Sequence, residues 1–138
     1  MEEKFNDWHH TSVAIRFADL DKLGHVNNAK YLTYIESARI PYFLDVMGEQ
    51  INWNEQGIIL AKAEVNFAIP VDLDDVEVSI FTHCSRIGGK SFDLSYVITK
   101  SDGRTICATA LTTLVCYNYL EGKTVAVPDS WREKMSRS

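Results

Sequence analysis

The sequence has few cysteines and no long hydrophobic run, and both shortages exclude whole classes of protein. It contains three cysteines in 138 residues, an odd number, and none of them belongs to a Cys-x-x-Cys pair. Cys84, Cys107 and Cys116 lie instead in apolar, strand-like stretches. We therefore expect buried free thiols rather than disulfides, metal ligands or a nucleophile.

The shortage of apolar runs also argues against membrane insertion and secretion. No segment approaches the roughly 20 apolar residues that cross a bilayer. Residues 1–8 also lack the apolar core of a signal peptide. We expect a soluble, cytoplasmic protein with no membrane partner.

Basic charge is scarce as well. The formal net charge is -5, and no run of Lys and Arg is interleaved with aromatic residues, so no nucleic acid partner is expected. With 46% hydrophobic residues, the chain suits one domain with a substantial core and is too short for two. We expect a single domain over residues 1–138, with its core at about 9–120 and a C-terminal tail at 121–138.

Hydrophobic periodicity first predicts a strand and then a helix. Apolar residues alternate with others between Thr11 and Ala18, which is the pattern of a strand with one buried face. From about Ala29 apolar residues recur at helical spacing until Gly48 supplies a stop signal. Pro41 falls inside this helix, where it removes a backbone hydrogen bond, so we expect a kink or a break just before it.

Strands fill the rest of the chain. Turn-forming residues separate four long stretches, and the expected strands are Ile58 to Ile69, Val76 to Ile87, Ser91 to Lys100 and Thr105 to Asn118. The helix is the one element able to cover the apolar face of such a sheet. The predicted fold class is therefore α+β, a curved antiparallel β-sheet wrapped on a long central helix.

The turn between the first strand and the helix, residues 19–31, concentrates polar side chains at a helix start. Its sequence is Asp-Leu-Asp-Lys-Leu-Gly-His-Val-Asn-Asn-Ala-Lys-Tyr. Unpaired N–H groups around Asn28 could stabilise an oxyanion. Asp21 and His25 could supply a nucleophile or a base. Capping explains the same residue types without catalysis, because Asp and Asn also cap helices and build turns. Composition and spacing leave both interpretations open.

Resemblance to a known family favours catalysis. The run Arg16–Arg39, which contains this turn and the following Tyr-Ile-Glu-Ser-Ala-Arg, looks like the signature of hotdog-fold thioesterases of the 4-hydroxybenzoyl-CoA thioesterase class. Glu64–Val71 and Ile87–Phe92 resemble that family's second strand and its mid-sheet turn. The similarity covers most of the chain, roughly residues 11–118. It implies the hotdog fold, in which a curved sheet wraps a long helix.

The resemblance also implies roles for individual residues. Asp21 matches the catalytic aspartate, which either attacks the thioester carbonyl or activates a water. The backbone N–H of Asn28 matches the oxyanion-hole donor. His25 matches a histidine of the acyl-carrier-protein branch of the family. Leu23 stands where that branch has an asparagine, so acyl-CoA is the favoured substrate.

Four further residues are expected to contact the substrate or support the site. Asn27 and Tyr31 would brace the turn and line the pocket. Lys90 would meet a CoA phosphate and Ser91 a pantetheine amide, although a solvated hairpin position is the alternative for Lys90.

The resemblance further implies a homo-oligomer, either a dimer or a tetramer of hotdog dimers, with active sites between subunits. A monomer would leave the edge strands of the sheet open. Neither a metal nor an organic cofactor is implied.

We therefore expect an acyl-CoA thioesterase, a hydrolase that releases free acid and CoA. Three alternatives stay open. They are a non-catalytic hotdog module that binds acyl-CoA, an acyl-acyl-carrier-protein thioesterase, and a hotdog hydratase or dehydratase in which His25 pairs with Asp21.

Overall fold

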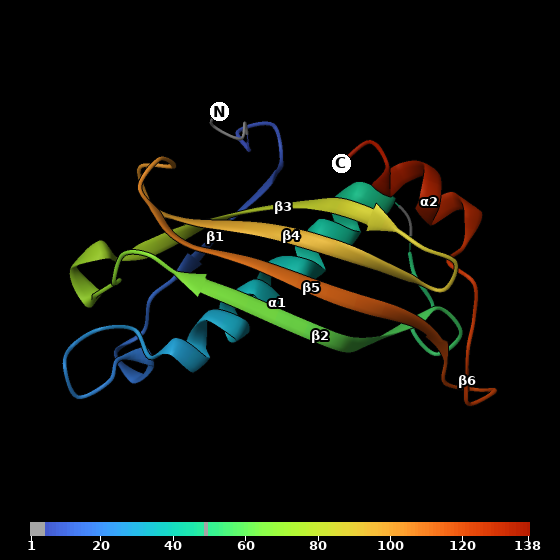
Figure 1. Cartoon of the computed structure of the whole chain (residues 1–138), viewed down its shortest axis with the longest axis horizontal. Coiled ribbons are helices and arrows are strands. Elements are labelled where there is room, and N and C mark those ends of the chain that lie inside the picture. Colours follow the sequence, from blue (N-terminus) through green and yellow to red (C-terminus); the bar gives the residue numbers. More distant parts are fainter. Residues whose placement is uncertain (1–4, 49) are drawn as a thin grey trace.

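The computed structural model describes residues 5–48 and 50–138 as a curved antiparallel sheet crossed by one long helix (Figure 1). In chain order the elements are β1 (His9–Ala14), η1 (Phe17–Asp19), α1 (Asn28–Met47), β2 (Gly57–Phe67), η2 (Leu73–Asp75), β3 (Glu77–Ile87), β4 (Ser91–Lys100), β5 (Ile106–Asn118), β6 (Lys123–Thr124) and α2 (Asp129–Met135). The two η elements are single 3-10 turns. The predicted α+β class and the order of strand, long helix and four long strands are confirmed.

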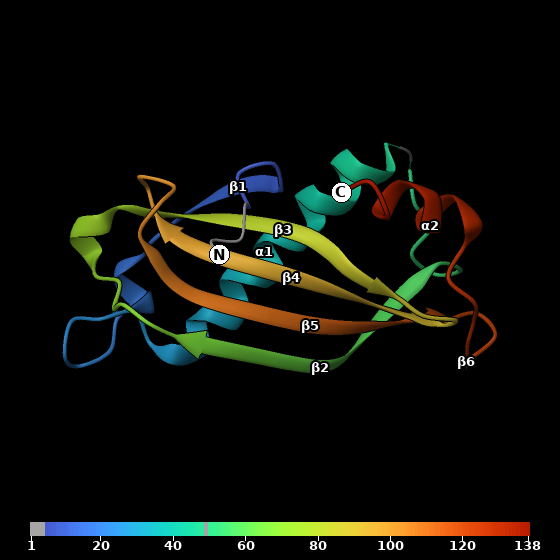
Figure 2. The ribbon, with the colours of Figure 1, turned by 45° about the horizontal axis from the view of Figure 1, so that its top comes forward.

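The strand order places the two strands that flank α1 at opposite edges of the sheet. The order is β1-β3-β4-β5-β2, all pairs are antiparallel, and the short β6 pairs with the end of β5. Because α1 connects β1 to β2, it must cross from one edge to the other. Both views show α1 passing across one face of the sheet (Figures 1 and 2). That face and the helix form the core between them.

Helix α1 begins and ends where the sequence signals predict, but it does not break at Pro41. Asn27 is the N-cap, and Gly48 ends the helix with a positive φ of 64°. Of the expected kink or break, the break is wrong, because helical structure continues without interruption through Pro41. Burial of the flanking residues explains the tolerance, since Tyr42 and Phe43 are almost fully buried and hold this turn against the sheet.

The core extends beyond residue 120, where the sequence pattern placed its end. Trp131 and Met135 of α2 are completely buried. The Trp131 ring lies 6.1 Å from that of Phe43 and 6.3 Å from that of Phe92, measured between centroids. Helix α2 therefore closes one end of the layer between α1 and the sheet.

The first strand is shorter than predicted because a turn replaces its end. The expected strand ran to Ala18, whereas β1 stops at Ala14. The Asp19 carboxylate accepts the N–H of Arg16 at 3.0 Å, which curls the chain into η1. As a result Phe17, which continues the alternation, is 80% exposed.

Strand β2 is an edge of the sheet, and its apolar residues are poorly covered. A register shift between Leu60 and Lys62 bends it where it pairs with β5. Leu60 and Phe67 keep about half of their surface exposed, at 47% and 50%. A long edge strand with exposed apolar side chains is a surface that another chain can pair with.

The three cysteines are free, as predicted. Cys107 and Cys116 are buried and Cys84 is partly buried. Burial raises the pKa of the Cys116 thiol to about 11, which keeps it protonated and unreactive. Among the described residues, no helix has the length and apolar character needed to cross a membrane.

Candidate active site

The loop that follows η1 is folded around the carboxylate of Asp21. Leu20 and Val26 form an antiparallel bridge, and the N–H of Asp21 donates to the carbonyl of His25 at 2.7 Å. At the tip, Gly24 has a φ of 84°, a conformation that other residues resist. The loop is therefore a tight hairpin.

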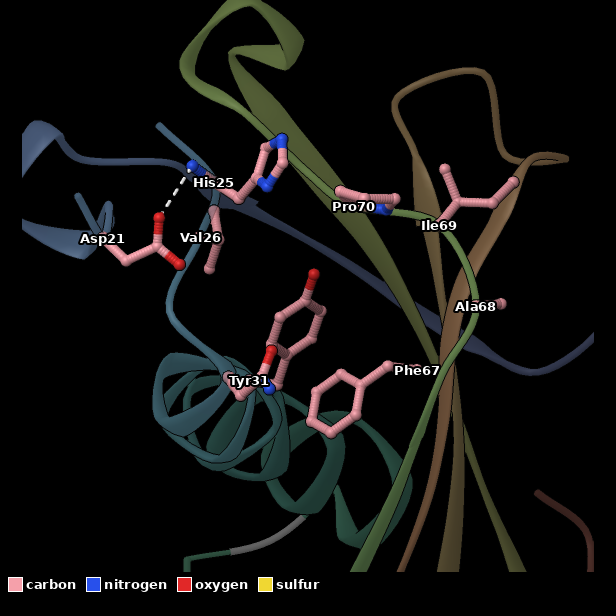
Figure 3. Close-up of a pocket in the computed structure, with 9 residues that line it drawn as sticks. Asp21, His25, Val26, Tyr31, Phe67, Ala68, Ile69 and Pro70 are labelled. Carbon is pink, nitrogen blue, oxygen red and sulfur yellow. Dashed lines mark hydrogen bonds between the residues drawn. The ribbon is translucent and has the colours of Figure 1, made fainter. Parts of the chain in front are cut away.

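One oxygen of Asp21 holds this hairpin together and the other does not take part. The N–H groups of Leu23 and His25 both donate to Oδ1, at 2.9 and 3.2 Å. In Figure 3 the second carboxylate oxygen is turned to the side on which Val26 and Tyr31 lie. The Asp21 side chain is exposed, so this oxygen is available to a ligand. The sequence left capping and catalysis open for Asp21, and its geometry accommodates both.

The start of α1 leaves one backbone donor without a partner. Asn27 Oδ1 accepts the N–H of Ala29 at 3.0 Å, and its carbonyl accepts the N–H of Lys30 at 2.8 Å. Asn28 is the first residue of the helix, and its N–H has no acceptor within residues 5–48 and 50–138. Asn27 therefore braces the helix start, while Asn28 presents a free N–H at the positive end of the helix dipole.

These residues surround a pocket of about 180 Å³. Figure 3 shows Asp21 and His25 on one side, Tyr31 at the base, and the chain from Phe67 to Pro70 on the other side. Asn28 also lines it. The structure thus brings four of the predicted site residues together at the start of α1.

Tyr31 forms the floor of the pocket. It is 3% exposed, and its ring packs edge-on against Phe67 with 5.1 Å between centroids. Burial raises the pKa of Tyr31 to about 12, so the phenol stays neutral at physiological pH. Tyr31 can donate or accept a hydrogen bond there, but it does not act as an anionic base.

The second wall of the pocket was not identified from the sequence. Phe67, Ile69 and Pro70 were assigned to a strand and its end, not to a site. They reach the pocket because β2 lies beside the start of α1, which is a tertiary contact. The resemblance of Glu64–Val71 to the family's second strand was the available signal.

Asp19 belongs to the support of the loop and not to the pocket. It is 1% exposed, and its carboxylate accepts hydrogen bonds from the Tyr34 hydroxyl at 2.7 Å and from Arg16. Burial by itself raises the pKa of Asp19, but the hydrogen bonds from Arg16 and Tyr34 outweigh it and hold the pKa below its ordinary value. Its carbonyl accepts the N–H of Asn27 at 2.8 Å, which ties η1 to the helix start.

Lys90 and Ser91 lie at the other end of the sheet from the pocket. Ser91 pairs with Val115 of β5, whereas Phe67 pairs with Ala108. Those two positions on β5 are seven residues apart, or about 23 Å along a strand. Within one chain, the turn that carries Lys90 and the pocket that holds Asp21 do not meet.

A long helix packed in a curved antiparallel sheet, with a polar pocket at the helix start, defines the hotdog thioesterase type of enzyme. Residues 15–135 match the thioesterase-like superfamily, and the chain belongs to this family. The match confirms the family and the enzyme class predicted from the sequence, a thioester hydrolase.

Individual relatives agree over nearly the whole chain. The long-chain acyl-CoA thioesterase FadM of Escherichia coli is 30% identical over 130 residues, which cover 92% of this chain and 96% of FadM. A thioesterase from Thermus thermophilus, solved in complex with coenzyme A and Zn, is 33% identical with a TM-score of 0.79, covering 93% of this chain and 91% of that one. A Pseudomonas aeruginosa protein at 21% identity has a TM-score of 0.85, covers 96% of this chain and 92% of its own, and shows the same fold.

Proposed function

We propose that this protein hydrolyses an acyl-CoA thioester to the free acid and CoA. The observation that carries the proposal is that the available oxygen of Asp21 and the free N–H of Asn28 border the same pocket. The known substrate class of FadM and the CoA bound to the Thermus thioesterase support a CoA ester. A long-chain acyl-CoA is therefore the first substrate to test.

The pocket provides for both halves of the reaction. The Asp21 carboxylate either attacks the thioester carbonyl carbon to give a mixed anhydride, or removes a proton from a water that attacks the same carbon. In both routes the C–S bond breaks, the CoA thiolate leaves and takes up a proton from solvent, and water supplies the new oxygen of the acid. The N–H of Asn28 stabilises the oxyanion formed on the way.

The neighbouring residues support these two groups. The backbone of His25 fixes the Asp21 carboxylate, and its exposed side chain lines the pocket. Asn27 holds the helix start so that the N–H of Asn28 points outward. Tyr31 offers a neutral hydroxyl from the floor of the pocket.

A homodimer built on the exposed edge of β2 brings the remaining predicted residues to the pocket. If two β2 strands pair antiparallel along their full length, the Gly57 end of one lies against the Phe67 end of the other. Ser91 is two strands from Ile59 in the same register, through Val115. Lys90 and Ser91 of one subunit would then face the Asp21 pocket of its neighbour, where a CoA phosphate and pantetheine could reach them. Such dimers can pair again into tetramers.

The Asp21→Asn variant tests the chemical proposal. An asparagine Oδ1 still accepts the N–H groups of Leu23 and His25, so the fold and the melting temperature should hold. Without the charge, we expect kcat for a long-chain acyl-CoA to fall about 10³-fold in a thiol-release assay. Asp74→Asn, an exposed aspartate nearby, is the matched control and should keep wild-type kcat. An unchanged kcat in Asp21→Asn would rule out the assigned mechanism.

Mixing two damaged subunits tests the shared site. Asp21→Asn and Lys90→Glu are each expected to turn over poorly at low substrate concentration. In a mixed dimer, one of the two sites combines intact Asp21 with intact Lys90. Co-refolding equal amounts should then restore about a quarter of wild-type activity. If activity does not rise above the mean of the two variants, each site lies within one chain.

An assay of two substrates that differ only in the carrier tests the choice between CoA and acyl-carrier protein. The CoA bound to the Thermus thioesterase and Leu23 in the loop favour CoA over acyl-carrier protein. We expect a higher kcat/KM with acyl-CoA than with the same acyl group on acyl-carrier protein. Binding without hydrolysis across a broad panel of acyl-CoAs would instead indicate a non-catalytic binding module. Hydration of crotonyl-CoA without thiol release would indicate a hydratase.

A further inference from the structure

The turn between β3 and β4 is held from behind by the C-terminal helix. Arg132 of α2 donates through Nη2 to the carbonyls of Gly88 and Gly89, at 2.6 and 3.0 Å. A guanidinium group that donates to two successive carbonyls fixes both their position and their direction. Helix α2 thus reaches across to the turn with a single side chain.

Two further hydrogen bonds, both from backbone N–H groups, hold the turn against the body of the protein. The N–H of Val127 donates to the carbonyl of Gly89 at 3.0 Å, and the N–H of Cys116 donates to the carbonyl of Lys90 at 2.8 Å. With the bonds from Arg132, the carbonyls of three successive residues are all engaged by the body of the protein. The negative ends of these peptide groups are therefore turned inward.

The outward side of the turn presents positive groups. The N–H groups of Gly89 and Lys90 have no acceptor among the described residues. A side-chain carbon added at Gly89 would meet nothing within 4 Å, so the space in front of the turn is open. Lys90 is exposed and makes one long contact, 3.5 Å from Nζ to the hydroxyl of Thr124. Two free N–H groups beside an ammonium are donors that can together bind an anion.

We propose that Arg132 is a positioning residue for CoA. By holding the carbonyls of Gly88 and Gly89 inward, it keeps the N–H groups of the turn and Lys90 directed at a phosphate of the substrate. The inference rests on the proposed acyl-CoA substrate. Arg132 acts through the turn, and its Nη2 is occupied by the two carbonyls.

A comparison of two thioesters of the same acid tests this role. Acyl-CoA carries the phosphates, whereas the acyl N-acetylcysteamine thioester keeps the reacting bond and one amide but has no phosphate. In Arg132→Met we expect KM for acyl-CoA to rise about tenfold, or about 1.4 kcal/mol, with kcat nearly unchanged. The kcat/KM for the N-acetylcysteamine thioester should equal that of the wild type.

Matched variants separate positioning from general damage. Arg137→Met removes an exposed arginine of the same helical region, which pairs with Glu133, and should leave both substrates unaffected. Arg132→Lys keeps the charge, but an ammonium does not hold two carbonyls in one fixed geometry as the guanidinium does. It should show a CoA-selective loss smaller than that of Arg132→Met. Lys90→Gln should reproduce the CoA-selective loss without touching α2, which keeps the test valid if Arg132→Met folds poorly. Equal losses on both thioesters, or no loss on either, would overturn the proposal.

Binding of free CoA distinguishes this inference from the catalytic one. If the wild type hydrolyses neither thioester, the proposed function fails, and calorimetric titration with CoA still tests the turn. We expect CoA to bind about tenfold more weakly to Arg132→Met than to the wild type or Arg137→Met. Equal affinity in all three proteins, or no CoA binding to the wild type, would overturn the role of Arg132.

Discussion

Removing the Tyr34 hydroxyl measures how strongly the loop beneath the active site is held. In the wild type this hydroxyl donates to the buried Asp19 carboxylate at 2.7 Å, beside the N–H of Arg16 at 3.0 Å. Tyr34→Phe leaves a carboxylate that is 1% exposed with one donor fewer. A hydrogen bond to a buried charge contributes about 1.5–3 kcal/mol, so we expect the free energy of unfolding to fall by about 2 kcal/mol. For a chain of this size that lowers the melting temperature by roughly 6 °C.

The loss of stability in Tyr34→Phe should depend on pH in a defined direction. The folded-state pKa of Asp19 lies below its ordinary value of 3.8, so the folded protein favours the ionised carboxylate. The ionised Asp19 carboxylate therefore stabilises the fold fully above its ordinary value of 3.8. This stabilisation disappears as pH falls through the lower folded-state pKa. Without the Tyr34 hydroxyl, the folded-state pKa of Asp19 moves up. The difference between wild type and variant should therefore be full at about pH 7 and shrink below about pH 4.

A second buried tyrosine provides the control. The Tyr42 hydroxyl bonds to the neutral Ser138 Oγ at 2.7 Å, so Tyr42→Phe should cost only about 1 kcal/mol, independent of pH. Both variants are compared with wild type by urea titration at one protein concentration, because the proposed dimer would make stability concentration-dependent. Equal losses for the two variants, or a Tyr34→Phe loss that does not change between about pH 7 and about pH 3, would refute the role assigned to Asp19.

Three further changes have expected outcomes. Trp131→Ala removes a completely buried ring of α2 and should lower the free energy of unfolding by about 3–5 kcal/mol in chemical denaturation. Gly24→Ala forces an alanine to a φ of 84°, which should lower the free energy of unfolding by about 1 kcal/mol. Because the Asp21 hairpin shifts, kcat should fall while KM changes little. Asn27→Ala removes the helix cap and should cost about 1 kcal/mol in stability by thermal unfolding, again with a loss of kcat. Unchanged stability in Trp131→Ala, or wild-type kcat in both loop variants, would contradict the packing and the loop geometry described above.

Local patterns predicted most of the architecture. Alternation and helical spacing located every long element, because each buries one face and its periodicity records that face. The predicted ends of the elements were less accurate where a single tertiary or side-chain contact changed the local structure. Asp19 curls the chain into η1 and shortens β1, and burial carries α1 through Pro41. The sequence pattern left residues 121–138 outside the core because few residues of α2 are apolar. Trp131 and Met135 of this helix are nevertheless completely buried.

The sequence by itself determined the loop and helix start that carry Asp21 and Asn28, because most of the hydrogen bonds that shape them join residues close in the chain. It also determined the family, through the residues of that loop. Only the tertiary structure decided what faces them, since Phe67 and Pro70 belong to the end of β2 and the segment after it, which bonds to the loop where the N–H of Val26 donates to the carbonyl of Val71. The structure likewise placed the turn of Lys90 at the other end of the sheet from its own pocket, since the β5 partners of Ser91 and Phe67 are about 23 Å apart, and put α2 behind that turn. Contacts between distant segments depend on how the sheet curves and which edges stay open, and no local pattern records that.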